Sequence, residues 1–373
     1  MEHILYWLWL VAGKRIRRTK ILKLFCDFES VENIYLSKSF HNIKYLTENE
    51  KLQLADKSLD KAERILETIA RLNAKILVYD DKNYPQLLKN ISNPPLVLYI
   101  QGKVPELDEV LTIGIVGTRK ATEHGMLVTD RISRYLAKSG VVTIGGIAEG
   151  IDAAGAWATI EEGGIAVAVI GNGLDIVYPP VNAELYRRLA EYGCIMTEYP
   201  PGSPPIHTHF PARNRIIAGI SRGVLVTEAP QKSGALITAR LAMENNRDVF
   251  AIPRDISKSG YLGTNILIQQ GAKLINNPQD ILCEYPYFKK IHQVHKELPK
   301  RQEAYNQSVN QINLDGLEDS DRTIAKLLLS GERQVDELAR ELKLPVSEVS
   351  VRLTMLEMKG IVKKLGNQYK LKL

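Results

Sequence analysis

Short apolar runs alternate with amphipathic stretches of helical length between Lys75 and about Ile275, and this alternation restricts the possible folds more than any other feature of the chain. Apolar runs of strand length separated by helical segments are typical of βαβ units. We therefore expect an α/β fold with a mainly parallel sheet and helices on both of its faces. The predicted strands are residues 75–79, 96–100, 111–116, 141–145, 165–171, 194–198, 223–228 and 248–253.

Most of the predicted strands end in glycine, an acidic residue or proline. Ligands of open α/β sheets bind at the carboxyl ends of the strands, so these endings predict one shared crevice. The endings are Gly117, Gly145-Gly146, Gly171-Asn172-Gly173, Glu198, Glu228 and Pro253.

The segments outside the sheet differ in pattern. Residues 1–74 have helical periodicity without strand-like alternation and predict a helical domain before the sheet domain of residues 75–284. Residues 285–318 are polar and mildly basic, which is typical of a flexible linker. Residues 319–373 contain three short amphipathic segments and then an alternating stretch that turns at a Gly-Asn pair. Three helices followed by a hairpin predict a winged helix-turn-helix.

Charge and composition narrow the classes of function. A net charge of +6 over 373 residues favours polyanionic partners without identifying one. The apolar stretch ILYWLWLVA is too short to span a bilayer, and it lacks a basic region before it and a cleavage site after it, so we expect a cytoplasmic protein with no membrane segment. Cys26, Cys194 and Cys283 have no CxxC spacing, which argues against disulfides and zinc.

The stretch GIVGTRKATEHG follows a predicted buried strand and precedes a helix. It matches neither GxGxxG nor the GxxxxGK[ST] of a P-loop, so neither a dinucleotide nor a P-loop nucleotide is indicated. Backbone N–H groups near Gly117 and Thr118, together with the guanidinium of Arg119, could instead hold a phosphate. The alternative is that these glycines only permit a tight turn between strand and helix.

The stretch GGIAEGIDAAG ends the next predicted strand and again leaves backbone N–H groups free at a helix start, here near Gly145 and Gly146. Glu149 or Asp152 could be a catalytic acid or a metal ligand. No His or Cys cluster accompanies them, so we favour a role in capping the helix or ordering the loop.

The stretch IHTHFPARNRIIAGISRG has the densest pattern. Arg213 and Arg215 flank Asn214 in the expected first turn of a helix, where cations are disfavoured unless an anion binds there. Phe210 could stack on a nucleic-acid base or could belong to the core. His207 and His209 form an HxH pair without a third metal ligand, so surface or structural roles are favoured.

Two further motifs need an interpretation. Lys232, Ser233 and Gly234 follow a predicted strand and open a helix, which makes another site for an anion unless Ser233 only caps that helix. GISRG matches the GxSxG of serine hydrolases, but Ser221 ends a helix and leads into a strand, the reverse of a nucleophile elbow. We therefore exclude serine hydrolysis.

The sequence resembles the bacterial DNA-processing protein A (DprA, also called Smf) family along nearly its whole length. The strings that carry the resemblance include GIVGTRKAT, GGIAEGIDAAGAWA, GNGLDIVYPPVNAELYRRL, HFPARNRIIAGISRGVLVTEAPQKSGALITARLA and GTNILIQQGA. The resemblance implies a SAM-like helical domain, an extended Rossmann core that binds single-stranded DNA without chemistry or a cofactor, and a C-terminal winged helix. It also implies that the protein protects incoming strands in natural transformation and loads RecA onto DNA coated by single-strand-binding protein.

Carried over to this sequence, the resemblance places the phosphate pocket on Gly117 to Arg119, on Arg213 to Arg215 and on Lys232 to Gly234, with Phe210 as the stacking ring. His207 stands where some relatives have a lysine, and a neutral imidazole weakens a phosphate contact. The resemblance also implies a homodimer through about Leu262 to Ile275.

The third helix of the predicted winged helix offers Glu348, Ser350 and Thr354, with Arg352 as a cation, and is poorly suited to major-groove readout. The hairpin side is basic, so we favour a non-specific DNA contact or a protein contact. The lysines of the hairpin side are Lys359, Lys363, Lys364, Lys370 and Lys372.

Two rival functions stay open. One is a Rossmann-type nucleotide hydrolase, and the other is a transcription factor with a ligand-sensing core.

Overall fold

The computed structural model describes residues 2–256, 262–288, 319–328, 333–342, 344–358, 361–365 and 368–371. The chain divides into two compact units, Met1–Glu297 and Leu298–Leu373. The first contains the N-terminal helices and the large sheet, and the second contains a small helical bundle with a three-stranded sheet. The linker predicted at residues 285–318 lies mostly outside the described residues, as do Lys359 and Lys372.

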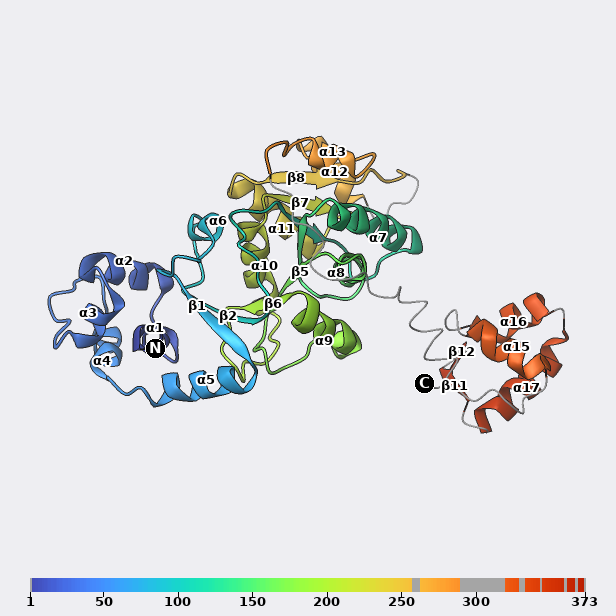
Figure 1. The fold of residues 1–373 in the computed structure, drawn as a ribbon, viewed down its shortest axis with the longest axis horizontal. Helices are drawn as coiled ribbons and strands as arrows, with labels where there is room; N and C mark the ends of the chain where they lie inside the picture. The colour runs from blue at the N-terminus through green and yellow to red at the C-terminus, as the bar shows by residue number, and fades with distance from the viewer. Residues whose placement is uncertain are drawn as a thin grey trace. The chain divides into compact units, whose positions relative to one another are not determined.

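Helices precede the sheet in the first unit (Figure 1). Thr47 and Glu50 form a capping box that fixes the start of one of them, each side chain accepting a backbone N–H of the other residue. Trp7 of α1 is fully buried in a core that continues to Val97 and Tyr99 of the sheet. The domain boundary at residue 74 therefore stays a prediction. The helices are α1 (Glu2–Val11), α2 (Arg18–Phe28), α3 (Val31–Leu36), α4 (Glu48–Ala55) and α5 (Asp60–Arg71).

The strands of the large sheet follow the order β1-β2-β6-β5-β4-β3-β7-β8-β9. Strand β2 pairs antiparallel with both β1 and β6. From β6 to β9 every pair is parallel, so the carboxyl ends of these strands share one edge. The strands are β1 (Ala74–Val78), β2 (Val97–Gly102), β3 (Thr112–Val116), β4 (Val142–Gly145), β5 (Ala166–Val169), β6 (Cys194–Thr197), β7 (Gly223–Val226), β8 (Asp248–Ala251) and β9 (Lys273–Leu274).

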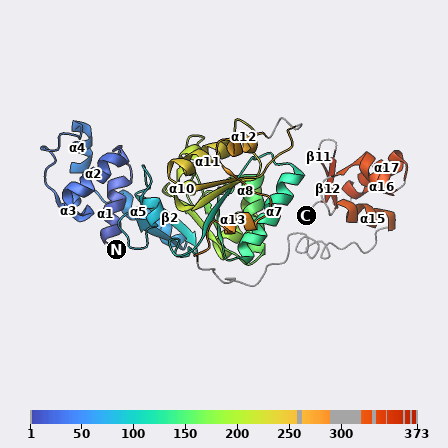
Figure 2. The same ribbon diagram turned by 90° about the horizontal axis from the view of Figure 1, so that it is seen from above.

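Helices cover both faces of the sheet (Figure 2). Alternate residues of a strand point to opposite faces, and the residues of β3 are apolar or small and buried on both, so each face needs a cover. Ile113 and Ile115 of β3 pack with α7 and α8 on one face, and Val116 belongs to the core under α10 and α11 on the other. The bounds are α6 (Gln86–Lys89), α7 (Glu123–Lys138), α8 (Ile151–Glu161), the 3-10 turn Pro180–Asn182, α9 (Ala183–Tyr192), α10 (His209–Ile220), α11 (Gly234–Glu244), α12 (Gly263–Gln269) and α13 (Gln279–Leu282).

The structure confirms the predicted α/β class, and each of the eight predicted runs contains a strand. The prediction missed β9, because a strand of two residues has no readable period. It also left open the direction of β2, since an apolar run indicates burial and not orientation. No helix among the described residues is both long enough and apolar enough to cross a membrane.

The second unit has the predicted winged-helix arrangement within its described residues. Ile324, Leu338, Leu353 and Val362 are buried together in its core. A short strand that the sequence did not predict, β10, joins the hairpin in the order β10-β12-β11. The elements are α15 (Asp319–Leu328), β10 (Arg333–Gln334), α16 (Val335–Leu342), α17 (Val346–Met358), β11 (Val362–Leu365) and β12 (Gln368–Leu371).

Candidate functional site

A cavity of about 320 Å³, here called the switch-point cavity, lies at the carboxyl edge of the sheet beside the neighbouring strands β3 and β7. The chain leaves β3 toward one half of the sheet, and β7 begins the other half. Ligands of α/β sheets bind at such a switch point. The predicted residues that line this cavity are Gly117, Thr118, Arg119, Phe210, Arg213, Asn214, Lys232, Ser233 and Gly234.

The loop after β3 is fixed by close packing and by one buried carboxylate. A Cβ added at Gly117 would lie 2.5 Å from the side chain of Ile151, so only glycine permits this approach of the loop to α8. The N–H of Thr118 donates to the backbone oxygen of Glu228 at 2.8 Å. The carboxylate of Glu228 accepts hydrogen bonds from the N–H and hydroxyl of Thr122 at 3.2 and 3.0 Å. The strand end of β7 therefore holds the loop after β3 in place, and the N–H of Thr118, which the sequence predicted to be available to a phosphate, already has a partner.

Phe210 supplies a flat apolar wall. Its ring stacks on Tyr178, with ring centroids 5.4 Å apart and planes 29° from parallel. The guanidinium of the exposed Arg119 lies 5.7 Å from the centroid of the Phe210 ring. An aromatic face next to a cation can stack a base and hold its phosphate.

Arg213 is almost completely buried in the cavity wall, with 5% of its surface exposed. Its Nη2 donates to the backbone oxygen of Gly146 at 3.0 Å, whereas its Nε has no hydrogen-bond partner among the described residues. A Cβ at Gly146 would lie 1.7 Å from Nη1 of Arg213, so this glycine makes room for the guanidinium. Burial lowers the pKa of Arg213 to about 10, against the attraction of Asp152. Arg213 therefore stays charged at neutral pH.

Asp152 orders the loop after β4, because its Oδ2 accepts the N–H of Gly146 at 2.9 Å. This bond confirms the loop-ordering role expected for an acid in this stretch. It also shows that the N–H of Gly146 is not free for an anion, so that expectation was wrong. Burial raises the pKa of Asp152, although the nearby Arg213 opposes this shift. Glu149 is exposed and does not line the cavity.

The loop after β7 contributes a cation and a helix start. Ser233 Oγ accepts the N–H of Ala235 at 3.2 Å and caps α11, as the simpler interpretation of this stretch expected. Asn214 Nδ2 donates to the backbone oxygen of Gly234 at 3.3 Å and joins α10 to α11. Lys232 is exposed at the cavity wall, where its charge is available to an anion.

Some predicted residues lie elsewhere. Arg215 does not line the cavity: its Nη1 and Nη2 donate to the two carboxylate oxygens of Glu198 at 2.8 and 2.7 Å. Gly145 and Gly146 are not wall residues either, although Gly146 contacts Arg213. The helix α10 begins at His209, so the expected first-turn position of the arginines is wrong, and the helix dipole is not the reason that an anion would bind there.

The HxH pair is divided between two environments. His207 is exposed and lines the switch-point cavity. His209 stacks on Tyr199 with ring centroids 3.9 Å apart, and its Nδ1 lies 3.0 Å from the backbone oxygen of Gly171. Within the described residues, no three His, Cys, Asp or Glu side chains are placed to hold a metal ion.

Sequence reasoning missed two contributors to the site. Glu228 was noted only as a strand ending, yet it holds the loop after β3 and forms an ion pair of 2.8 Å with Arg254. Its position at the end of an apolar run was the available signal. Tyr178, which stacks behind Phe210, has no local pattern that reveals its role.

Comparison with known proteins places these segments in a family. The family described as DNA recombination-mediator protein A matches residues 75–286, which include every residue of the switch-point cavity. The chain belongs to this family. A second family model, the winged-helix domain of DprA, matches residues 313–368. The two matches together fall in both compact units.

Individual relatives in this family show the same relationship. Protein Smf of Synechocystis is 39% identical over 319 residues, which is 80% of each chain. The crystal structure of DNA processing protein A from Streptococcus pneumoniae has a TM-score of 0.61 at 33% identity, over 75% of this chain and 97% of that one. The same protein from Helicobacter pylori, described for its mode of binding single-stranded DNA, has a TM-score of 0.52 at 31% identity, over 57% of this chain and 94% of that one.

Proposed function

We propose that this chain binds single-stranded DNA in the switch-point cavity and makes or breaks no bond there. The observation that carries the proposal is the convergence of Arg119, Arg213 and Lys232 with the ring of Phe210 on one cavity. The relationship to the Helicobacter pylori protein, whose description concerns binding of single-stranded DNA, supports the same ligand.

The contacts favour a sugar-phosphate chain over a particular base. Arg213 offers a buried Nε–H without a partner in the described residues, and Arg119 and Lys232 offer charges at the rim. Such donors bind phosphates, and phosphate contacts carry no sequence information. Stacking on Phe210 tolerates every base, because each base has a π-face. We therefore expect binding with little sequence preference.

The test is the affinity for homopolymeric single strands across a series of salt concentrations. Arg119→Ala should weaken binding to all homopolymers alike and should make the log-log salt slope shallower by roughly 0.7, the value for one phosphate contact on a single strand. The matched control is Arg131→Ala, which removes the same charge from α7 at an exposed position outside the cavity wall. It should leave both affinity and slope nearly unchanged.

The rival function is a Rossmann-type nucleotide hydrolase. It would replace our proposal if Arg119→Ala left single-strand affinity unaltered while the unsubstituted chain turned over nucleotides. A transcription factor with a ligand-sensing core would instead select one duplex sequence over others. We expect neither nucleotide turnover nor selection of one duplex sequence, because contacts to phosphates and to the faces of bases do not read sequence.

We also propose a role for the bound complex, based on the family. The chain would protect incoming single strands in natural transformation and load RecA, with single-strand-binding protein as a further partner and a homodimer formed through about Leu262 to Ile275.

A pull-down with RecA tests the partner. The full-length chain should retain RecA on single-stranded DNA, and a chain ending near Asp315 should show whether the contact lies in the first compact unit. Failure of the full-length chain to retain RecA would contradict the loading role. Size measurement by light scattering tests the dimer.

A further inference from the structure

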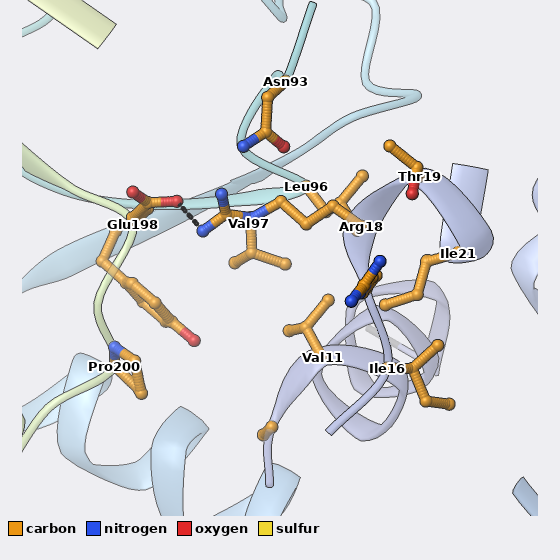
Figure 3. A pocket seen from close by; sticks show the side chains of 13 residues that line it. Val11, Ile16, Arg18, Thr19, Ile21, Asn93, Leu96, Val97, Glu198 and Pro200 are labelled. Atoms are coloured by element: carbon orange, nitrogen blue, oxygen red, sulfur yellow. Dashed lines mark hydrogen bonds and ion pairs between the residues drawn. The ribbon is translucent and has the colours of Figure 1, made fainter. Parts of the chain in front are cut away.

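A second and larger cavity, here called the α2 cavity, lies between the start of α2 and the start of β2. Its volume is about 710 Å³. Figure 3 shows Val11, Ile16 and Ile21 on the side of the N-terminal helices, with Leu96 and Val97 facing them from the sheet. This volume lies in the range of sites for small ligands, and the wall combines polar and apolar surface in about equal parts.

Two cations pair with one carboxylate at this cavity, and a third cation lies in the cavity wall. Glu198 is buried and pairs with Arg215 from α10 and with Arg18 from α2, which reaches across the cavity in Figure 3. The third cation, Arg17, is exposed and forms no ion pair with any described carboxylate. The local charge is therefore positive, and Arg17 is the cation available to an incoming anion.

Other donors face the same space. Arg17 is the N-cap residue of α2, and no side chain caps the helix there, so N–H groups of its first turn remain available. The side-chain amide of Asn93, another wall residue, makes no hydrogen bond within the described part of the chain, whereas its backbone oxygen accepts from Arg215. The wall thus combines three features: donors that can bind an anion, a side-chain amide and an apolar surface.

The two cavities open at the same edge of the sheet. Tyr99 of β2 pairs antiparallel with Thr197 of β6, so the start of β2 lies beside the carboxyl end of β6. Three strand steps separate β6 from β3 in the sheet order, which corresponds to about 14 Å. Helix α10 contributes to both places, because Arg213 lines the switch-point cavity and Arg215 bonds Glu198 of the α2 cavity.

We propose that the α2 cavity binds a nucleoside phosphate, with the phosphate on Arg17 and the start of α2, the base against Val97 and its apolar neighbours, and the Asn93 amide at the edge of the base. Its source is either a further nucleotide of the strand held in the switch-point cavity, in which case the inference rests on the proposed function, or a free nucleotide. The same chemistry recognises both.

The experiment measures anisotropy of labelled oligothymidylates of about four and about fifteen nucleotides, lengths that span the range of known single-strand sites. Thymidine monophosphate is measured separately by calorimetry. The variants are Arg17→Ala and Thr19→Trp, which places a large ring at an exposed wall position. Arg15→Ala is the matched control, since it removes the same charge from an exposed residue outside the wall. Surface positions of this kind rarely affect folding.

If the source is the strand, Arg17→Ala and Thr19→Trp should weaken binding of the longer oligonucleotide about tenfold and leave binding of the shorter one unchanged. Arg17→Ala should also make the salt slope of that binding shallower by roughly 0.7. If the source is a free nucleotide, both variants should instead weaken binding of thymidine monophosphate. The inference is overturned if the variants match Arg15→Ala with all three probes. Failure of the proposed function looks different: the unsubstituted chain would bind neither oligonucleotide, and the monophosphate would still test this cavity.

Discussion

Single residues decide which cations reach the switch-point cavity. Arg213 and Arg215 are two positions apart on α10, so their side chains project about 200° apart around the helix. One therefore enters the cavity and the other turns to Glu198. The sequence correctly predicted that cations cluster here, but it could not show that these two arginines lie on opposite sides of α10. That assignment depends on where α10 begins.

Gly146 offers a test at the level of one atom. Gly146→Ala would place a methyl group 1.7 Å from Nη1 of Arg213, so the guanidinium must move. We expect a loss of about 1–3 kcal/mol in the free energy of unfolding, measured by urea denaturation, together with weaker binding of single strands.

The control for this substitution is Gly234→Ala. It adds the same methyl group at a wall residue with no other atom within 4 Å of the new carbon. Stability should hold there. Equal losses from the two substitutions would show that Gly146 has no special role in placing Arg213.

Elements were predicted more reliably than their directions. Each apolar run became a strand because a strand buried on both faces has to be apolar throughout. The reversal of β2 leaves no mark in that pattern, since the pattern is the same in either direction. The α2 cavity depends on this reversal, because it brings Val97 to the edge where β6 ends. The sequence therefore predicted the switch-point cavity and not the second one.

The exposed face of α17 extends what the sequence indicated about the winged helix. Arg352 donates to Asp321 and Glu348 at 3.1 and 3.2 Å, so its charge is already engaged. Val351 and Met355 are about half exposed on this helix. An apolar face without an available cation is unsuited to the phosphates and base edges of a major groove, which agrees with the sequence-based interpretation.

Within the first unit, His3 links the N-terminal helices to the loop that follows β1. Its ring bonds Glu32 of α3 and, at 2.9 Å, Asp80 after β1. Burial lowers the pKa of His3, but the hydrogen bonds to these two carboxylates outweigh burial and raise the pKa above its ordinary 6.5. The imidazolium therefore ties the N-terminal helix to the sheet when it is protonated.

This link predicts a pH dependence of stability. A histidine whose pKa is higher in the folded state contributes stability that is fully present below pH 6.5 and is lost as the pH rises through the folded value. The free energy of unfolding should thus decrease above about pH 6.5. His3→Gln should remove that part of the decrease, as followed by chemical denaturation across the pH range.

The control is His41→Gln, which changes an exposed histidine of the same helical region. Its pH profile should match that of the unsubstituted chain. A profile for His3→Gln that also matches would refute the role of the imidazolium.

The core shared by the N-terminal helices and the sheet bears on how this protein can diverge. Trp7 and Leu8 of α1 lie in the same apolar cluster as Val97 and Ile195 of the sheet. A change of side-chain volume on either side must be matched on the other, because interiors are packed without spare space. Chimeras assembled from relatives would therefore have to exchange the two parts together, as a single inherited piece.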